Sequence, residues 1–314
     1  DMTDVISIEV LGSRIDELAA DRRSIPFDDE PIYPSKSRMA YDWRKAVSTH
    51  FQKTGEPKGR ERNSLGSMFT YVSSDLSVYD LCGVKVGGQR GEYPTVMAGT
   101  IFYVKDKIVT DAKTGTFDKK IAAELIQTQD EYSVRYKIPV MVHVVGQTAN
   151  AIERYLLFVV DHTDSPIVID SSSIDVRIHG ISLAKDIGIE DRAIFNSVIT
   201  ANSEEREKLE EIGGTKYAIF LSFEETAEQT VNKAKEILNF FGKVIEKPII
   251  DPGVPKLGSG SLSALERAWI LKNRLGLPTA IGIHNLHSDL RNLGDIRFDF
   301  DYTLPTLFGV DINL

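Results

Sequence analysis

The sequence predicts an α/β protein, a (β/α)8 TIM barrel with an N-terminal extension. Three observations predict this fold. Short apolar runs, typical of parallel strands buried on both faces, recur at a period of roughly 25 to 30 residues. Amphipathic segments long enough to form a helix separate most of these runs. Polar residues stand where the runs end, and the carboxyl ends of the strands carry the chemistry of such barrels.

Seven apolar runs follow one another along the chain. They are PTVMAGTIFYV, PVMVHVVG, PIVIDSS, RAIFNSV, KYAIFLSF, KPIIDPG and PTAIGIHN. Several begin with or just after a proline, which the first residue of a strand tolerates. We expect the eighth strand near TLFGVDI. A doubly wound open sheet competes, but it usually has fewer strands and a Gly-rich first turn, and no G-x-G-x-x-G follows the first run.

The beginning of the chain differs from the rest. We assign residues 1–79 to an extension and residues 80–314 to the barrel. DVISIEVL alternates as a strand does, while SRIDELAADRR and SRMAYDWRKAVSTHFQ have helical patterns. At the junction, VYDLCGVKVGGQ predicts a β-hairpin that turns at Gly83. We expect Cys82 in this hairpin to be a buried, small apolar residue.

The bulk composition excludes several classes of protein. A hydrophobic content of 42% and a charged content of 26% are typical of a soluble globular protein. The longest apolar runs fall far short of the about 20 residues that span a bilayer, so we expect no membrane insertion. The net charge of −9 argues against nucleic acid as the main partner. The single cysteine permits neither an internal disulfide nor a thiolate metal cage, which fits a cytoplasmic protein.

The polar strand ends favour a flat heterocyclic ligand such as a pterin. A carboxylate can accept both a ring N–H and the neighbouring exocyclic amine. A carboxamide can then meet the remaining ring nitrogens and the carbonyl, because it both donates and accepts. The set has little positive charge, which makes phosphate a poorer fit. Its members are Tyr103 or Lys105, Gly146-Gln147, Asp170-Ser171-Ser172, Asn196-Ser197, Glu224-Glu225, Asp251 and His284-Asn285.

Simpler roles compete at these positions. Asp170 or Asp251 could cap the loop that follows its strand, as aspartate often does. Asn196 could bond only to neighbouring backbone. The cluster Ser171 to Ser173 lacks a G-x-S-x-G elbow, so we expect no serine nucleophile.

The histidines predict neither a metal centre nor a catalytic base. His284 and His287 have a spacing that could suggest a metal, but nothing else in the chain completes a site, and we expect no metal. His143, His162 and His179 are scattered along the chain. We expect them to be packed or exposed rather than catalytic.

A Gly-rich loop carries a second signal. LGSGSLSALERA places Gly258, Ser259 and Gly260 before a helix that we expect to be capped by Ser263 and Glu266. Gly-rich backbone at the start of a helix can hold an anion or let a ligand approach closely. A tight turn that simply needs glycine explains the loop equally well.

With these residues in place, the chain resembles the H-subunit family of tetrahydromethanopterin S-methyltransferase, which also includes bacterial methylcorrinoid:tetrahydrofolate methyltransferases. The resemblance runs from about Tyr79 to Asn285. It rests on GGQRGEYPTVMAGTIFYVKDKIVTDAKTGTFDKK, PIVIDSS, DRAIFNS, KPIIDPGVPKLGSG and GLPTAIGIHN.

The resemblance implies a fold, an activity and partners. The family is a homodimeric barrel that binds a reduced pterin, either tetrahydromethanopterin or tetrahydrofolate. It passes a methyl group between the pterin nitrogen and the cobalt of a corrinoid (cobalamin) held on a separate protein. The partner implied is therefore a corrinoid protein, and through it a membrane methyltransferase complex of methanogenesis.

The resemblance also implies residue roles. The aspartate, asparagine and aspartate that hold the pterin in related methyltransferases fall on Asp170, Asn196 and Asp251. An asparagine that contacts the reacting nitrogen falls on Asn285. We therefore expect Asn285 and Asp251 to act in catalysis. The expected pterin site comprises Asp170, Ser171, Asn196, Asp251, Gly258, Ser259 and Asn285.

The chain departs from the family pattern in three places. Phe223-Glu224 replaces the usual F-N, LHSDLRNLGDIRFDFDY follows Asn285 in place of a Ser-Ala-Trp run, and residues 1–79 have no counterpart. These departures leave open a second function, a non-catalytic paralogue that binds pterin and docks a corrinoid protein. A dihydropteroate synthase is disfavoured by GIHN and VMAGTIFY and by the lack of a basic strand end for pyrophosphate.

Overall fold

The structure, a computed structural model, describes residues 71, 75–89, 91–254 and 263–282. Contacts divide the chain into two units, Asp1–Thr70 and Tyr71–Leu314, and every described residue belongs to the second unit. The strand and the two helices expected near the start of the chain lie outside the described residues. Within the described ranges, no helix is long and apolar enough to cross a membrane.

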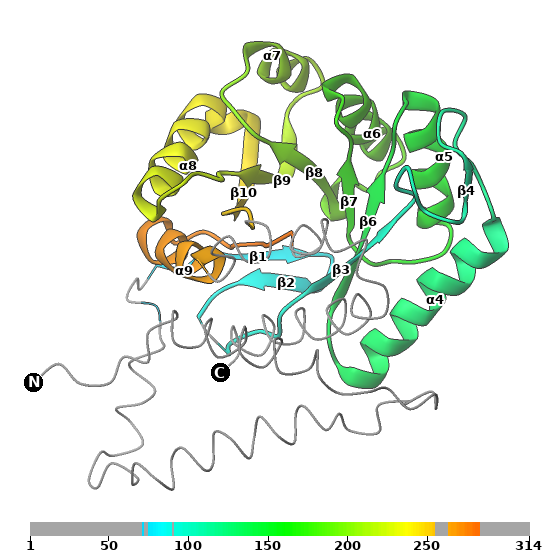
Figure 1. The fold of residues 1–314 in the computed structure, drawn as a ribbon, viewed down its shortest axis with the longest axis horizontal. Coiled ribbons are helices and arrows are strands. Elements are labelled where there is room, and N and C mark those ends of the chain that lie inside the picture. Colours follow the sequence, from blue (N-terminus) through cyan, green and yellow to red (C-terminus); the bar gives the residue numbers. More distant parts are fainter. Residues whose placement is uncertain (1–70, 72–74, 90, 255–262, 283–314) are drawn as a thin grey trace, which may run out of the picture. The chain divides into compact units, whose positions relative to one another are not determined.

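A six-stranded parallel sheet forms the centre of the described unit (Figure 1). Its strands lie side by side in chain order, and a parallel bridge from Ile250 to Thr279 sets the seventh predicted run beside the last of them. The parallel α/β arrangement is thus confirmed. The run expected as the eighth strand, residues 306–312, lies outside the described residues. The six strands are β3 (Met97–Ile101), β6 (Val140–Val145), β7 (Ile167–Asp170), β8 (Ala193–Val198), β9 (Thr215–Leu221) and β10 (Ile245–Asp251).

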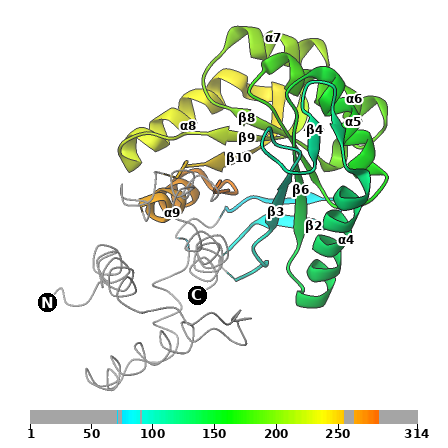
Figure 2. The same ribbon diagram turned by 45° about the vertical axis from the view of Figure 1, so that its right-hand side comes forward.

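Helices between the strands cover one face of the sheet, and the sheet curves away from them (Figure 2). Four of the helices begin at a side chain that accepts a backbone N–H from the first turn, which satisfies donors that a helix start leaves without a partner. These caps are Asp118, Thr148, Asn202 and Thr226. The helices are α4 (Lys119–Tyr136), α5 (Ala149–Val160), α6 (Ile174–Asp186), α7 (Ser203–Glu211), α8 (Ala227–Phe241) and α9 (Ser263–Leu275).

The strand side chains divide between two apolar clusters, as the alternation of a pleated strand requires. On the face toward the helices, residues such as Ile169 and Phe195 are fully buried in the larger cluster. On the opposite face, which we call the inner face, Val168 and Ile194 belong to a smaller cluster. The small cluster also takes in Met141, Tyr217 and Ile249 from the other strands.

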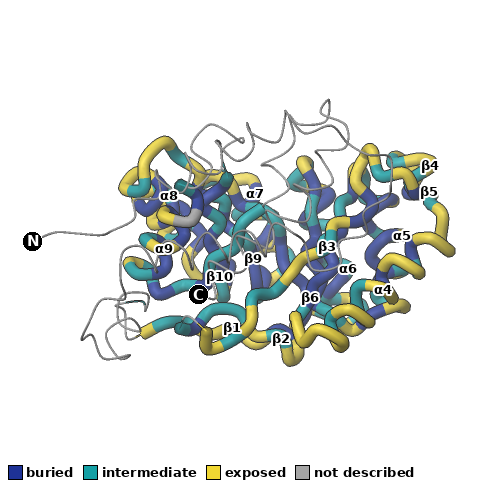
Figure 3. The backbone as a smooth tube through the Cα atoms, turned by 60° about the horizontal axis from the view of Figure 1, so that its bottom comes forward, coloured by how far each residue is buried: buried dark blue, intermediate teal, exposed yellow. Residues whose placement is uncertain are grey.

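A β-hairpin closes the N-terminal part of the inner face. It consists of β1 (Val78–Leu81) and β2 (Val84–Gly87), as the sequence predicts. Tyr79 and Leu81 are buried against the small cluster, and the Tyr217 hydroxyl donates to the carbonyl of Asp80 at 2.7 Å. Figure 3 shows the hairpin beside the buried strands of the sheet.

One local expectation is wrong, and one element was not predicted. Cys82 is exposed rather than buried, because it lies in the hairpin turn with φ of 51°. A second hairpin, β4 (Val109–Asp111) with β5 (Thr116–Phe117), was not anticipated from the sequence. Its turn is stabilised by Asp111, whose Oδ1 accepts the backbone N–H of Lys113 at 2.9 Å. Such short strands leave too few alternating residues to be seen in the sequence pattern.

Candidate functional site

Asp170 and Asn196 meet at the C-terminal edge of the inner face. They are direct partners in the register of β7 and β8. Each stands two residues after an inner-face member of the small cluster, Val168 and Ile194, so each side chain points to the same inner face. Both residues are half-buried. The sequence expectation placed them at neighbouring strand ends, and the register brings them together there.

Asp251 reaches the same edge from β10. It follows Ile249 of the small cluster by two residues and therefore also faces inward. Its carboxylate accepts the backbone N–H of Gly253 at 2.7 Å and that of Gly282. Burial raises the pKa of Asp251 to about 6, although these two hydrogen bonds act in the opposite direction. The residue keeps partial surface exposure, yet protein atoms surround its carboxyl closely enough to make the ionised form costly.

The loop after β10 requires glycine at position 253. Gly253 has φ of +67°, and a Cβ there would lie 2.6 Å from the Cβ of Phe223. This backbone conformation turns the Gly253 N–H back toward the Asp251 carboxylate. The sequence feature Asp-Pro-Gly after a buried strand is therefore the local cause of the Asp251 geometry.

His143 lies next to Asp170, a contact that was not predicted from the sequence. Its Nε2 is 2.9 Å from Oδ2 of Asp170, and its Nδ1 is 3.0 Å from the Thr100 hydroxyl. The alternation of side chains along β6 could have revealed this position. His143 is two residues beyond Met141, so its side chain points to the same inner face. Our expectation of a scattered, packed or exposed histidine was thus incomplete, because His143 contacts a predicted ligand residue.

The loop after β7 is held from behind by a buried ion pair. Arg177 of α6 donates to the carbonyl of Ser171 at 2.6 Å and to Glu205 of α7 at 2.5 Å. Burial raises the pKa of Glu205, and the Arg177 guanidinium opposes that rise. Ser171 itself is buried, and its hydroxyl accepts the backbone N–H of Ser173 at 3.2 Å. The network fixes the chain immediately after Asp170.

Three predicted site residues, Gly258, Ser259 and Asn285, lie outside the described residues. In the sequence, Gly258 and Ser259 fall between Gly253 and the start of α9 at Ser263, and Asn285 follows Gly282.

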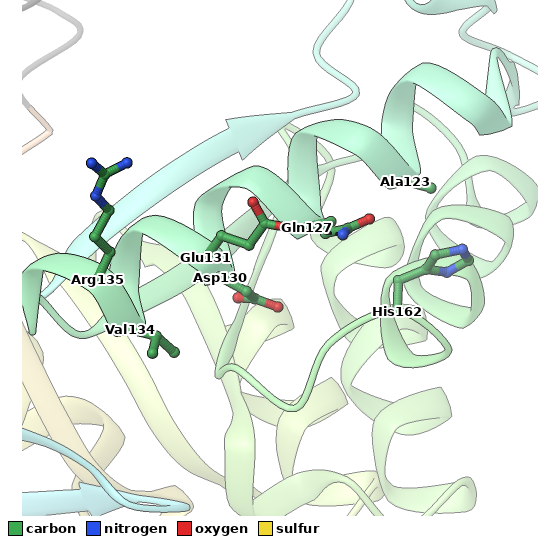
Figure 4. A pocket seen from close by; sticks show the side chains of 7 residues that line it. All are labelled: Ala123, Gln127, Asp130, Glu131, Val134, Arg135 and His162. Atoms are coloured by element: carbon green, nitrogen blue, oxygen red, sulfur yellow. Dashed lines mark hydrogen bonds between the residues drawn. The ribbon is translucent and has the colours of Figure 1, made fainter.

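A hollow on the helical side of the molecule is a separate feature. It is lined by α4 and by His162, which follows α5, and Figure 4 shows these side chains around it. The hollow lies away from the inner face. Asp130, which lines it, accepts a hydrogen bond from the Ser165 hydroxyl at 3.2 Å. Among the described residues, no group of three or more His, Cys, Asp or Glu side chains could hold a metal ion. The predicted ligand residues Asp170, Asn196 and Asp251 lie instead at the C-terminal edge of the inner face.

Comparison with known proteins adds a family. The family model of the tetrahydromethanopterin S-methyltransferase MtrH subunit matches residues 74–301. The H-subunit of this enzyme from Methanothermobacter thermautotrophicus is 42% identical over 254 residues, 76% of this chain and 80% of that protein. The corresponding protein from Methanopyrus kandleri is 36% identical, over 70% of this chain and 73% of that protein. The one from Methanococcus maripaludis is 37% identical, with the same two coverages.

Proposed function

The chain belongs to the MtrH family of tetrahydromethanopterin S-methyltransferase subunits, and from this membership we propose its reaction. It is a methyltransferase that moves a methyl group between the nitrogen of a reduced pterin and the cobalt of a corrinoid on a separate protein. The observation that carries the proposal is the convergence of Asp170, Asn196 and Asp251 on one edge of the inner face.

The chemistry of these three groups fits a pterin ring. An ionised carboxylate accepts only, and the ring N–H with its exocyclic amine offers two parallel donors. Asp251 suits this pair because its carboxyl is already removed from bulk water. Charge-assisted hydrogen bonds are stronger in such an environment than in water. Asn196 can both donate and accept, which meets the alternating nitrogens and carbonyl of the ring. Asp170 supplies the further acceptor beside it.

The rest of the proposed pterin site is assigned from the sequence. We assign Ser171 to it through its position after Asp170, and Gly258, Ser259 and Asn285 through the family resemblance. In this proposal Asp170, Asn196 and Asp251 hold the ring, and Asn285 contacts the reacting nitrogen. Asp251 also acts in catalysis, because it fixes the ring against which the methyl carbon must be aligned.

Methyl transfer requires alignment more than acid–base power. The methyl carbon must lie in line between the nitrogen and the cobalt, so holding the ring in one orientation lowers the barrier. The nitrogen is a poor leaving group until it gains positive character, and Oδ1 of Asn285 would stabilise the protonated form by accepting the hydrogen bond that its N–H donates. In the opposite direction the same contact would orient the nitrogen lone pair. A bound corrinoid would supply the cobalt centre that accepts or donates the methyl group.

Fold closure and assembly complete the proposal. The eighth strand, near residues 306–312, would close the sheet between β3 and the run at Thr279 into a (β/α)8 barrel. The protein would act in the cytoplasm as a homodimer and dock a corrinoid protein, through which it would meet a membrane complex. Tetrahydromethanopterin is the carrier in the relatives' names, and tetrahydrofolate is the alternative carrier to be tested beside it.

The test is methyl transfer to free cobalamin. Purified protein is mixed with a methyl-tetrahydropterin and cob(I)alamin, and formation of methylcobalamin is followed by its absorption spectrum. We expect transfer with at least one of the two pterins. Tight pterin binding without transfer would contradict the proposal and point to the non-catalytic paralogue.

A further inference from the structure

A row of three hydrogen-bonded side chains, Thr100, His143 and Asp170, lies on the β3 side of the candidate pterin site. We propose that His143 and Thr100 are positioning residues, which hold Oδ2 of Asp170 so that Oδ1 is presented to the pterin. The ligand in this proposal rests on the proposed function above. The row consists of the protein's own side chains and can be tested without any ligand.

The row crosses three adjacent strands. Thr100 of β3 and His143 of β6 are direct partners in the sheet register. Asp170 of β7 pairs with Val145, two residues beyond His143, so the row runs diagonally toward the C-terminal edge. The contacts are 3.0 Å from the Thr100 hydroxyl to Nδ1 and 2.9 Å from Nε2 to Oδ2 of Asp170. A diagonal of this kind lies within reach of long side chains on neighbouring strands.

Hydrogen-bond chemistry assigns the protons along the row. An ionised carboxylate has no proton to donate, so Nε2 of His143 must carry the hydrogen that meets Asp170. In the neutral imidazole Nδ1 is then an acceptor, and the Thr100 hydroxyl is its donor. Each bond therefore has one donor and one acceptor, and the row selects the Nε2–H tautomer of His143.

The His143 side chain is less exposed than the Asp170 side chain that it supports. The His143 side chain is 12% exposed, whereas that of Asp170 is 26% exposed. The imidazole thus contacts one carboxylate oxygen from the interior, and the carboxylate keeps an accessible side at the edge where Asn196 stands. A carboxylate held in this way loses little further rotamer freedom when a ligand binds, which favours affinity.

The arrangement differs from that of a hydrolase triad. In such triads Nε2 faces the nucleophilic hydroxyl and Nδ1 faces the carboxylate. Here the two nitrogens are exchanged, with the hydroxyl at Nδ1 and the carboxylate at Nε2. The geometry therefore supports positioning of Asp170 rather than activation of Thr100.

Calorimetric titration with the pterin that binds the wild-type protein tests the proposal. His143→Leu removes both hydrogen bonds, and we expect binding to weaken by about 10-fold to 100-fold, by analogy with residues that orient the ligands of a metal ion. His143→Gln keeps an N–H donor near the Nε2 position and should recover most of that loss. Thr100→Val should weaken binding less than His143→Leu. The matched control is His179→Leu, since His179 pairs with Glu153 at 3.2 Å on the surface of α6 and should leave binding unchanged.

A double-mutant cycle tests whether His143 affects pterin affinity through Asp170. In an Asp170→Ala background, His143→Leu should cost little additional affinity, because the carboxylate that His143 positions is absent. An undiminished loss in that background would overturn the proposal. So would wild-type affinity in a folded His143→Leu protein, or a Gln variant no better than the Leu variant.

Heteronuclear NMR of the His143 ring nitrogens in the unliganded protein separates the two claims. We expect the Nε2–H tautomer in the wild type and a loss of that preference in Asp170→Asn. An Nδ1–H tautomer together with normal pterin binding would refute the positioning role and leave the proposed function intact. The expected tautomer in a protein that binds no reduced pterin would support the row and refute the proposed function.

Discussion

The two halves of the inner face use the same strands for opposite purposes. Toward the N-terminal ends, Val168, Ile194 and Ile249 are covered by the β1–β2 hairpin and exclude water. Asp170, Asn196 and Asp251 stand two residues further along the same strands and are not part of the small cluster. The first half stabilises the fold, and the second half keeps polar groups half-buried at some cost in stability. Because residues two apart on a strand share a face, one strand contributes both to the small cluster and to the polar edge.

The largest effect should come from the residue proposed to contact the reacting nitrogen. We expect Asn285→Ala to lower the methyl-transfer rate by about 100-fold or more, since a hydrogen bond that strengthens in the transition state contributes to the rate itself. Pterin binding should fall by much less. Rates and affinities are measured separately, by the cobalamin assay and by calorimetry. Equal losses in both would mean that Asn285 only positions the ring.

A pair of substitutions on β8 tests the division within one strand. Ile194 is fully buried in the small cluster, so Ile194→Ala should lower the free energy of unfolding by about 2–5 kcal/mol. The folded variant should bind pterin normally. Asn196→Ala, two residues away on the same face, should cost less stability and weaken binding. Denaturant unfolding and calorimetry on both variants check this, and a reversed pattern would contradict the separate roles of the two positions.

The raised pKa of Asp251 predicts a pH-dependent cost in stability. The native pKa is about 6 and the ordinary value is 3.8, so between these values the native state holds more protons than the unfolded state. Stability from this group is therefore greatest below pH 4 and falls as the pH rises through 6. Asp251→Asn removes this dependence and should be more stable than the wild type above pH 6, by up to about 3 kcal/mol.

Unfolding curves of the two proteins across this pH range measure the difference. It should be near zero below pH 4 and largest above pH 6. A difference that does not change with pH would show that burial does not perturb this carboxyl. In the wild type, pterin affinity should also fall as the pH drops below 6, because a protonated Asp251 can no longer accept two hydrogen bonds.

The smallest expected effect lies in the hairpin half. The Tyr217 hydroxyl donates to the Asp80 carbonyl, so Tyr217→Phe should cost about 1 kcal/mol of unfolding free energy. Pterin binding and transfer should not change. A clear loss of transfer in a folded Tyr217→Phe protein would mean that the two halves are coupled.

The sequence predicted the sheet well because its strands are apolar runs of strand length, each bounded by a proline, a glycine or a polar residue. It also placed Asp170 and Asn196 at adjacent strand ends, since parity and strand order suffice for that inference. His143 was missed because its partner lies 27 residues away, and only the register of β6 and β7 shows the contact. The place of the β1–β2 hairpin under the small cluster and the raised pKa of Asp251 likewise depend on tertiary packing.

The pterin site is tested by a calorimetric titration of the wild type, Asp251→Ala and Asp186→Ala with tetrahydromethanopterin and tetrahydrofolate. Asp186 is an exposed aspartate at the end of α6 and serves as the control. We predict that the wild type and the control bind at least one reduced pterin. Asp251→Ala should bind it about 100-fold more weakly, through the loss of two charge-assisted hydrogen bonds. Unchanged affinity in Asp251→Ala would contradict the assignment of this edge as the pterin site.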